Sequence, residues 1–214
     1  MFQSVPDFSS SSMTQAFDTF LRQFHMTGSE KADGYSRDAF EGLAEHEKNT
    51  VFDMLAGELP WAAEWLFQLD PARALAVAME LEPGMRGRNS GVHWLQRQIV
   101  GLAGDLRYQR HMIEDYPGYA ARDRAGVIAS IAATPANGET IAFFKDVIRD
   151  DDDGSAVHAA VRALLRALRM PCGTAQEKAR YDRLETGLRS ADPAAKAAAI
   201  AELERFEPVW TAHE

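Results

Sequence analysis

The sequence predicts an all-α protein built from antiparallel helix hairpins, and three observations support this prediction. Apolar residues recur at spacings of three and four along nearly the whole chain, and strand-like alternation is almost absent. Aspartates that precede predicted helices recur at intervals of 38 to 45 residues, a period typical of stacked helical hairpins. The 214 residues, 46% of them hydrophobic, are enough to bury a core. We therefore expect a short α-solenoid, with an irregular helical bundle as the alternative.

The apolar spacing also places the individual helices. The first contains the stripe Phe17, Phe20, Leu21 and Phe24, and the second covers residues 37–59, where Gly42 is a point at which the helix can break in two. Further helices are expected at residues 61–68, 71–81, 91–103, 106–114, 119–133, 139–149, 155–169, 175–189 and 193–206. Residues 1–12 are expected to form a flexible lead, followed by a single all-helical domain over residues 13–214.

The starts of the helices reveal an internal repeat. Asp70-Pro71 and Asp192-Pro193 each place a capping acceptor before a proline at the first helical position. The segments 70–81 and 192–203 share six of twelve aligned residues. Asp115 and Asp153 lie between them, so that the four aspartates are 45, 38 and 39 residues apart. This spacing predicts helical hairpins of about 40 residues each.

One segment carries a resemblance to a known repeat family. The sequence DGSAVHAAVRALL at residues 153–165 has an aspartate in a turn, followed by a helix of small residues that bears Val161-Arg162. In these features it resembles HEAT-like repeats, and a degenerate form of the pattern extends over residues 50–207. The resemblance implies a short, degenerate HEAT-like solenoid, a class whose extended surfaces bind other macromolecules.

The charge of the chain is unevenly distributed. Residues 1–82 hold 14 acidic and 5 basic side chains, whereas residues 83–214 hold 18 of each, so the formal charge of −9 belongs to the first part. We therefore divide the domain into an acidic part, residues 13–82, and charge-neutral repeats, residues 83–214. Such an asymmetry points to a charged partner, although a solvated, solubilising face is the alternative.

Composition argues against two classes of partner. Nucleic-acid binders neutralise phosphates with lysine and arginine, and the arginines of this chain interleave with carboxylates. No stretch approaches the ~20 apolar residues of a membrane-spanning helix, and residues 1–12 do not resemble a secretory signal. We therefore expect neither nucleic acid nor membrane as a partner, and a cytoplasmic location.

No residue pattern points to a catalytic, cofactor or metal site. The single cysteine, Cys172, excludes an internal disulfide and a zinc site built on several thiolates. His46 lacks the second histidine of a metalloprotease helix, and the His111–Glu114 spacing of a di-iron helix has no second copy. The acidic run at residues 150–153 lacks the first and last ligands of a calcium loop, and Asp153 is expected instead to cap the next helix.

The acidic part is the candidate surface for a partner. If residues 37–59 form one helix, then Asp38, Glu41 and Glu45 lie on one of its faces, opposite Phe40 and Val51. An acidic surface favours a basic partner and speeds its encounter with the protein.

Further residues are expected to belong to this surface or to lie near it. Glu58 and Glu64 extend it in sequence, and three tyrosines around the second aspartate turn are candidates for polar-tipped contacts: Tyr108, Tyr116 and Tyr119. Trp61 and Trp65, one helical turn apart, could anchor an interface. We expect them instead to pack between the first hairpins.

The overall plan resembles that of bacterial immunity proteins that neutralise polymorphic toxins. Three segments look like theirs: GLAEHEK at 42–48, LFQLDPARA at 66–74 and LAGDLRY at 102–108. The resemblance implies a non-catalytic protein that binds a basic toxin domain, such as a nuclease, and blocks it. The alternatives are a HEAT-like scaffold or adaptor, a HEAT-like enzyme such as a lyase or a Cys172-dependent transferase, and a helical bundle that binds a small molecule.

Overall fold

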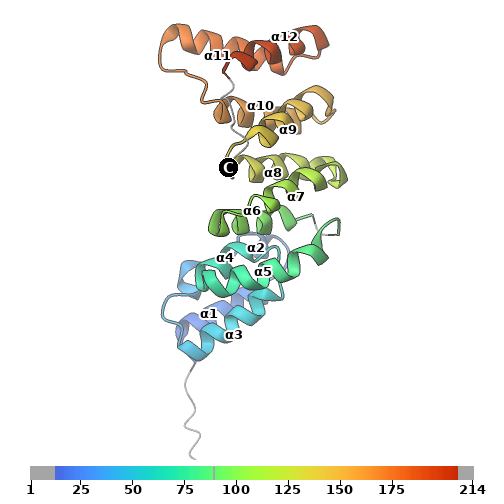
Figure 1. Cartoon of the computed structure of the whole chain (residues 1–214). Coiled ribbons are helices and arrows are strands. Elements are labelled where there is room, and N and C mark those ends of the chain that lie inside the picture. The colour runs from blue at the N-terminus through green and yellow to red at the C-terminus, as the bar shows by residue number, and fades with distance from the viewer. Residues whose placement is uncertain (1–12, 89, 207–214) are drawn as a thin grey trace, which may run out of the picture. The chain divides into compact units, whose positions relative to one another are not determined.

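A computed structural model describes residues 13–88 and 90–206, and in this part of the chain every regular element is a helix. The all-α prediction is confirmed (Figure 1). The expected flexible lead, residues 1–12, lies outside the described residues. The chain divides into two compact units, residues 1–74 and residues 75–214, and each is described separately below. The division falls inside helix α5 (Pro71–Met85), ahead of residue 82, where the charge composition changes.

Unit 1 contains α1 (Gln15–Phe24), α2 (Ser29–Ala32), the short 3₁₀ helix η1 (Arg37–Ala39), α3 (Glu45–Ala56), α4 (Ala63–Leu69) and the start of α5. The Thr14 side chain caps α1 by accepting a hydrogen bond from the Phe17 backbone. Glu47 of α3 accepts hydrogen bonds from the backbone N–H and the hydroxyl of Thr14, at 2.8 and 2.7 Å. These hydrogen bonds join the start of α1 to α3, and the Glu47 side chain that accepts them is buried.

The segment at residues 37–59 is broken at Gly42, the position at which the sequence allowed a break. Gly42 has a φ of 92°, in the left-handed region that favours glycine, and it separates η1 from α3. Asp38 therefore lies in η1, Glu41 in the turn that follows, and Glu45 at the first position of α3. The three carboxylates therefore do not share one helix face, which was expected only if residues 37–59 formed a single helix.

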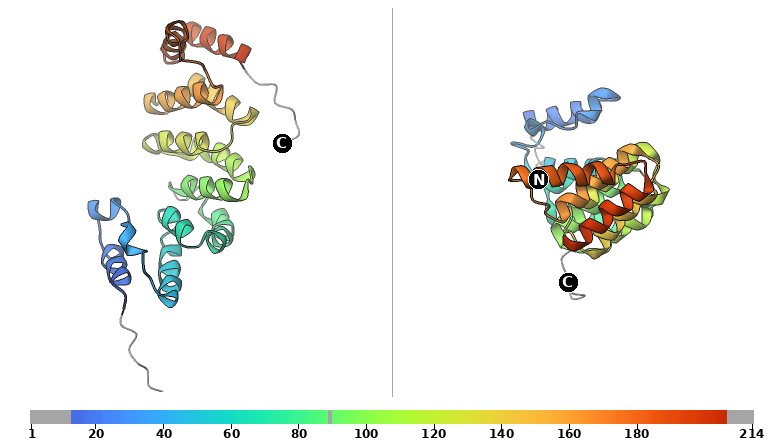
Figure 2. Two further views of the ribbon diagram at one scale, coloured as in Figure 1. Left: turned by 90° about the vertical axis from the view of Figure 1, so that its left-hand side faces the viewer. Right: turned by 90° about the horizontal axis from the view of Figure 1, so that it is seen from above.

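Unit 2 contains the rest of α5, followed by α6 (Val92–Ala103), α7 (Arg107–Asp115), η2 (Tyr116–Gly118), α8 (Ala121–Ala132), α9 (Gly138–Asp150), α10 (Gly154–Ala167), α11 (Ala175–Leu188), α12 (Pro193–Leu203) and η3 (Glu204–Phe206). Within this unit α6 packs on α8 and α8 on α10, whereas α7 packs on α9 and α9 on α12 (Figure 2). Such packing is compatible with the predicted hairpin repeat. The assignment to HEAT-like repeats remains a prediction.

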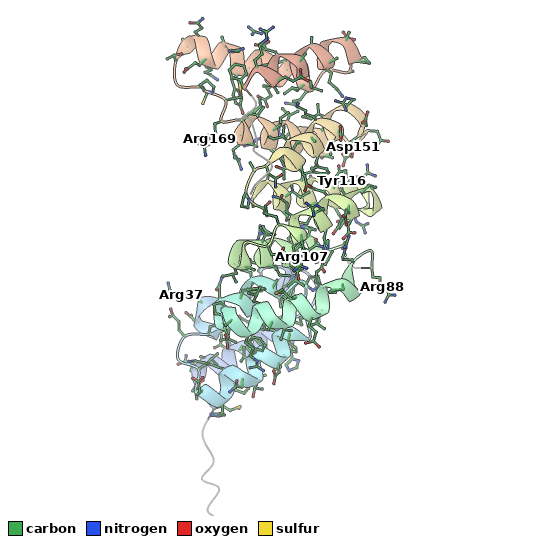
Figure 3. All side chains as sticks on the ribbon, viewed as in Figure 1. Arg37, Arg88, Arg107, Tyr116, Asp151 and Arg169 are labelled. Carbon is green, nitrogen blue, oxygen red and sulfur yellow. The ribbon has the colours of Figure 1, made fainter. Side chains whose placement is uncertain are left out.

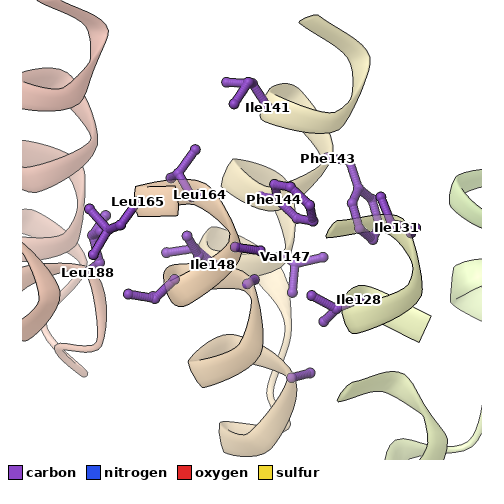
Figure 4. Packing of buried hydrophobic residues seen from close by; sticks show 14 of the residues in the cluster. Ile128, Ile131, Ile141, Phe143, Phe144, Val147, Ile148, Leu164, Leu165 and Leu188 are labelled. Atoms are coloured by element: carbon purple, nitrogen blue, oxygen red, sulfur yellow. The ribbon is translucent and has the colours of Figure 1, made fainter. Parts of the chain in front are cut away.

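A continuous core joins the helices of unit 2. Ile128 and Ile131 of α8 belong to one buried cluster with Phe144 and Ile148 of α9 (Figure 4). Further residues of α10, α11 and α12 extend this core to Leu203, which is fully buried. Each helix therefore depends on its neighbours to cover its apolar face.

Three of the four repeating aspartates act as predicted. Asp70, Asp153 and Asp192 each accept a hydrogen bond from a backbone N–H in the first turn of the following helix, at 3.0, 2.9 and 3.0 Å. Asp115 does not: it is the last residue of α7, and both of its carboxylate oxygens accept hydrogen bonds from Arg86. The next helix, α8, follows Ala120, whose side chain cannot cap it.

In the part of the chain that the structure describes, no helix combines the length and apolar character needed to cross a membrane.

Candidate functional site

The candidate site is the set of exposed carboxylates in unit 1 that have no cationic partner among the residues that the structure describes. Residues 13–74 contain 11 carboxylate and five cationic side chains, a formal charge of −6. Each of the five cations forms an ion pair within the unit: Arg22–Asp18, Lys31–Glu58, Arg37–Glu41, Lys48–Glu45 and Arg73–Asp53. Local pairing therefore uses every cation in this part of the unit, and six carboxylates are left over.

Two of these six carboxylates have structural roles in helix starts. Glu47 accepts hydrogen bonds from Thr14 and from the backbone of Ala44, and Asp70 caps α5. The other four are exposed and have no cationic partner among residues 13–88 and 90–206: Glu30, Asp33, Asp38 and Glu64. The amide of Gln68 donates a long, 3.4 Å hydrogen bond to Glu64. These four residues form the unpaired acidic set.

The structure divides the sequence-predicted carboxylates into three environments. Asp38 and Glu64 belong to the unpaired acidic set. Glu41 and Glu45 are exposed and pair with Arg37 and Lys48 across one helical turn or less. Exposed pairs of this kind contribute about 0–1 kcal/mol, so a partner's cation can compete for these carboxylates at little cost.

Glu58 lies in the third environment, because it faces the interior of unit 1. Its two oxygens accept hydrogen bonds from Lys31 Nζ at 2.8 Å and from the Tyr35 hydroxyl at 2.7 Å. The Lys31 ammonium also lies 4.7–5.1 Å from the ring centroids of Phe24, Tyr35 and Trp61. Burial and the hydrogen bond to Glu58 raise the pKa of the Tyr35 hydroxyl well above its ordinary value. Glu58 therefore has a structural partner already.

Trp61 and Trp65 belong to the same aromatic cluster. Their ring centroids are 4.9 Å apart, and both rings contact Tyr35. Both residues are half-buried, in keeping with the expected packing role. The Lys31, Tyr35, Glu58 and Trp61 side chains form what is called below the lysine clasp.

The three predicted tyrosines lie in unit 2 and are buried. Tyr108 and Tyr116 are each 7% exposed and Tyr119 is 8% exposed, which corrects their assignment as contact residues. The Tyr116 hydroxyl donates a 2.6 Å hydrogen bond to Asp151, and burial followed by this bond raises the pKa of Tyr116 (Figure 3). Spacing around an aspartate turn could not distinguish these buried rings from exposed ones.

Unit 2 also brings together a serine and a histidine that are far apart in sequence. His93 Nδ1 lies 2.8 Å from the Ser130 hydroxyl oxygen, and both residues are buried. Burial, and next the nearby charge of Arg97, lower the pKa of His93 to about 4. Such a histidine is a weak base at neutral pH, and general bases work best with a pKa near the working pH. The pair is best described as a buried structural hydrogen bond.

His111 and Glu114, which have the spacing of a di-iron helix, bond to different partners. Glu114 accepts a hydrogen bond from Arg86 at 2.9 Å, whereas His111 Nδ1 lies 2.9 Å from the buried carboxylate of Glu82. Among the described residues, no group of three or more histidine, cysteine, aspartate or glutamate side chains has a metal-binding arrangement. Cys172 is an exposed free thiol in the segment between α10 and α11.

Sequence reasoning missed Glu30 and Asp33 of the unpaired acidic set. The four-residue helix α2 that contains Glu30 has no apolar periodicity, because it is too short to show one. A count of charges along residues 29–39 could have found both residues, since only two cations lie among them.

Comparison with protein-family models, with curated proteins and with solved structures found no match for this chain.

Proposed function

We propose that this chain is a protein-binding protein that presents the carboxylates of unit 1 to a basic protein partner. One observation carries the proposal: all five cations of residues 13–74 are paired internally, and the unpaired acidic set remains exposed. Unpaired like charges on a folded unit repel one another, so they oppose its stability. A complementary cationic surface removes this repulsion and gains favourable charge contacts.

The physical chemistry of the surface favours a protein as the partner over nucleic acid. Phosphates carry the same charge as the surface and are repelled by it. A basic protein domain is attracted over the Debye length, about 8 Å at physiological ionic strength, and its association is accelerated. The exposed ion pairs of Glu41 and Glu45 add carboxylates that a partner can recruit.

We further propose that the partner is a toxin domain and that the chain is its immunity protein. The support is the resemblance of the segments at 42–48, 66–74 and 102–108, together with the localised negative charge. In this function the chain performs no chemistry: it covers a basic surface that the toxin needs for its own substrate. A scaffold or adaptor would use the same surface, and only the identity of the partner separates the two.

Co-expression tests this proposal directly. The product of the adjacent gene, produced alone, is expected to be toxic, and the chain is expected to neutralise it and to co-purify with it. A harmless neighbour that does not bind would contradict the immunity function, whereas a harmless neighbour that binds tightly would indicate an adaptor.

A pair of charge-matched variants tests the surface. The first variant neutralises the unpaired acidic set: Glu30→Gln, Asp33→Asn, Asp38→Asn and Glu64→Gln. The control removes four exposed carboxylates of unit 2: Glu80→Gln, Glu139→Gln, Asp182→Asn and Glu204→Gln. We expect the first variant to slow association about 10- to 100-fold at low salt and the control to change it less than about threefold. Equal effects of the two variants would place the contact elsewhere.

A further inference from the structure

We propose that a groove in unit 2 receives a lysine or arginine side chain of the basic protein partner. The groove has a volume of about 320 Å³ and is formed by the end of α7, by η2, by the start of α8, by the second half of α9 and by the turn between α9 and α10. Four of its lining residues are apolar, namely Ile113, Pro117, Phe143 and Val147. The remaining lining residues include four aspartates, at positions 146, 150, 151 and 152. This inference takes the basic protein partner from the proposed function and adds a second contact site.

The innermost aspartate of the groove is already satisfied. Asp151 accepts hydrogen bonds from Arg124 Nη1 at 3.0 and 3.1 Å and from the Tyr116 hydroxyl at 2.6 Å. The backbone N–H of Asp153 donates to it at 2.8 Å. The lining arginine of the groove, Arg124, is therefore held by a carboxylate whose side chain is only 5% exposed (Figure 3 shows Tyr116 and Asp151).

The outer aspartates are less well neutralised. Asp152 has a fully exposed side chain and lies 3.7 Å from Arg124, which is already bonded to Asp151. Asp146 pairs with Arg149 at 2.8 Å, and both side chains of this pair are more than half exposed. Asp150 has neither an ion pair nor a hydrogen bond from its side chain among residues 13–88 and 90–206. The rim of the groove therefore carries uncompensated negative charge.

The positions of Asp146 and Asp150 in α9 strengthen this argument. Asp150 is the last residue of the helix, where the macrodipole is negative and a carboxylate is unfavourable, and Asp146 lies one turn earlier. Asp153, by contrast, caps α10 and has a local reason to be acidic. Local helix stability therefore does not explain Asp150. A cation bound at this end of α9 would interact favourably with both the carboxylates and the dipole.

The apolar residues that line the groove indicate which kind of cation binds there. A bare metal ion would leave the exposed apolar surface of Ile113 and Pro117 facing water, and an uncharged apolar ligand would leave the aspartates unpaired. Lysine and arginine side chains satisfy both parts, because their methylene stems cover apolar surface while their charged ends reach polar groups. The groove volume lies at the small end of the range for ligand pockets, ~300–1,000 Å³, and is large enough to admit one lysine or arginine side chain.

The test uses the full-length, ¹⁵N-labelled protein and a small probe, Nα-acetyl-L-arginine amide, titrated into it by NMR. We expect saturable changes in the chemical shifts of the backbone amides of Ile113, Val147 and Asp150. We expect none with Nα-acetyl-L-citrulline amide, which has nearly the same shape but no charge. The double variant Asp150→Asn/Asp152→Asn should weaken binding at least fivefold, and the exposed control Asp182→Asn/Glu204→Gln should not change it.

Four outcomes would overturn the groove proposal: no saturable shift, shifts confined to other surfaces, equal binding of the citrulline probe, or binding unaffected by Asp150→Asn/Asp152→Asn. The probe requires no native partner, so its result is independent of the co-expression experiment. If the arginine probe binds in the groove but no basic partner is found, only the proposed function fails. If the partner binds the double variant as tightly as it binds the original chain, only the groove fails.

Discussion

The lysine clasp gives the sharpest test of the energetics of unit 1. Lys31 Nζ donates hydrogen bonds to the Phe24 carbonyl, the Tyr35 hydroxyl and Glu58 at 2.9, 3.0 and 2.8 Å. These three bonds use all three donors of the ammonium group. The substitution Lys31→Met keeps an unbranched apolar stem and removes only the charge and these bonds. We expect it to destabilise the unit substantially.

The magnitude follows from the contacts. A hydrogen bond to a charged group contributes about 1.5–3 kcal/mol, and each cation–π contact contributes about 0.5–1 kcal/mol. The side chains of Lys31 and Glu58 are 20% and 24% exposed, so water screens part of their attraction. The cost of desolvating the ammonium, which Met does not incur, offsets a further part. We therefore expect a loss of about 2–4 kcal/mol in the free energy of unfolding, a large share of the ~5–15 kcal/mol typical of a folded domain.

Urea unfolding followed by tryptophan fluorescence is the assay, because Trp61 is part of the lysine clasp and its ring lies beside the Lys31 ammonium. The matched control is Lys48→Met, which breaks an exposed pair whose side chains are 45% and 85% exposed, and which should cost less than about 1 kcal/mol. The double mutant Lys31→Met/Glu58→Gln should be less destabilised than the sum of the single mutants, by about 1 kcal/mol or more. A Lys31→Met protein as stable as the control, or strictly additive effects, would refute this account.

Three further predictions concern backbone, protonation and burial. Gly34→Ala should lower the melting temperature more than Gly28→Ala. Both glycines have positive φ, 77° and 61°, but only at Gly34 would an added Cβ collide with a neighbouring indole ring. Equal decreases in melting temperature for the two variants would contradict this prediction. Because the pKa of His93 is about 4 in the folded chain against 6.5 when unperturbed, the unfolded chain binds the proton first as the pH falls. The free energy of unfolding, measured with urea, should therefore fall by up to about 3 kcal/mol between pH 6.5 and pH 4, and His93→Gln should flatten this dependence. Tyr116→Phe, which removes the 2.6 Å bond to Asp151, should cost about 1–2 kcal/mol in the same assay, and an unchanged midpoint would show that this bond contributes nothing.

The sequence alone determined the class of the fold and most of the helices, because both depend on local patterns. The expected helix at residues 155–169 is α10 at Gly154–Ala167, and that at 175–189 is α11 at Ala175–Leu188. The caps at Asp70, Asp153 and Asp192 were equally readable, since an N-cap bonds to residues only two or three positions away. The excess of negative charge near the N-terminus could be found by counting charged residues along the sequence.

Only the tertiary structure decided which charged and aromatic side chains are available to a partner. Glu58 is turned inward by Lys31, which lies 27 positions away, and Asp115 is held by Arg86, 29 positions away. Tyr116 is buried through its bond to Asp151, 35 positions away. Ion pairing and burial depend on contacts between residues far apart in the chain, and helical periodicity carries no information about them. The sequence therefore located the acidic part, and the tertiary structure determined which of its carboxylates have no cationic partner.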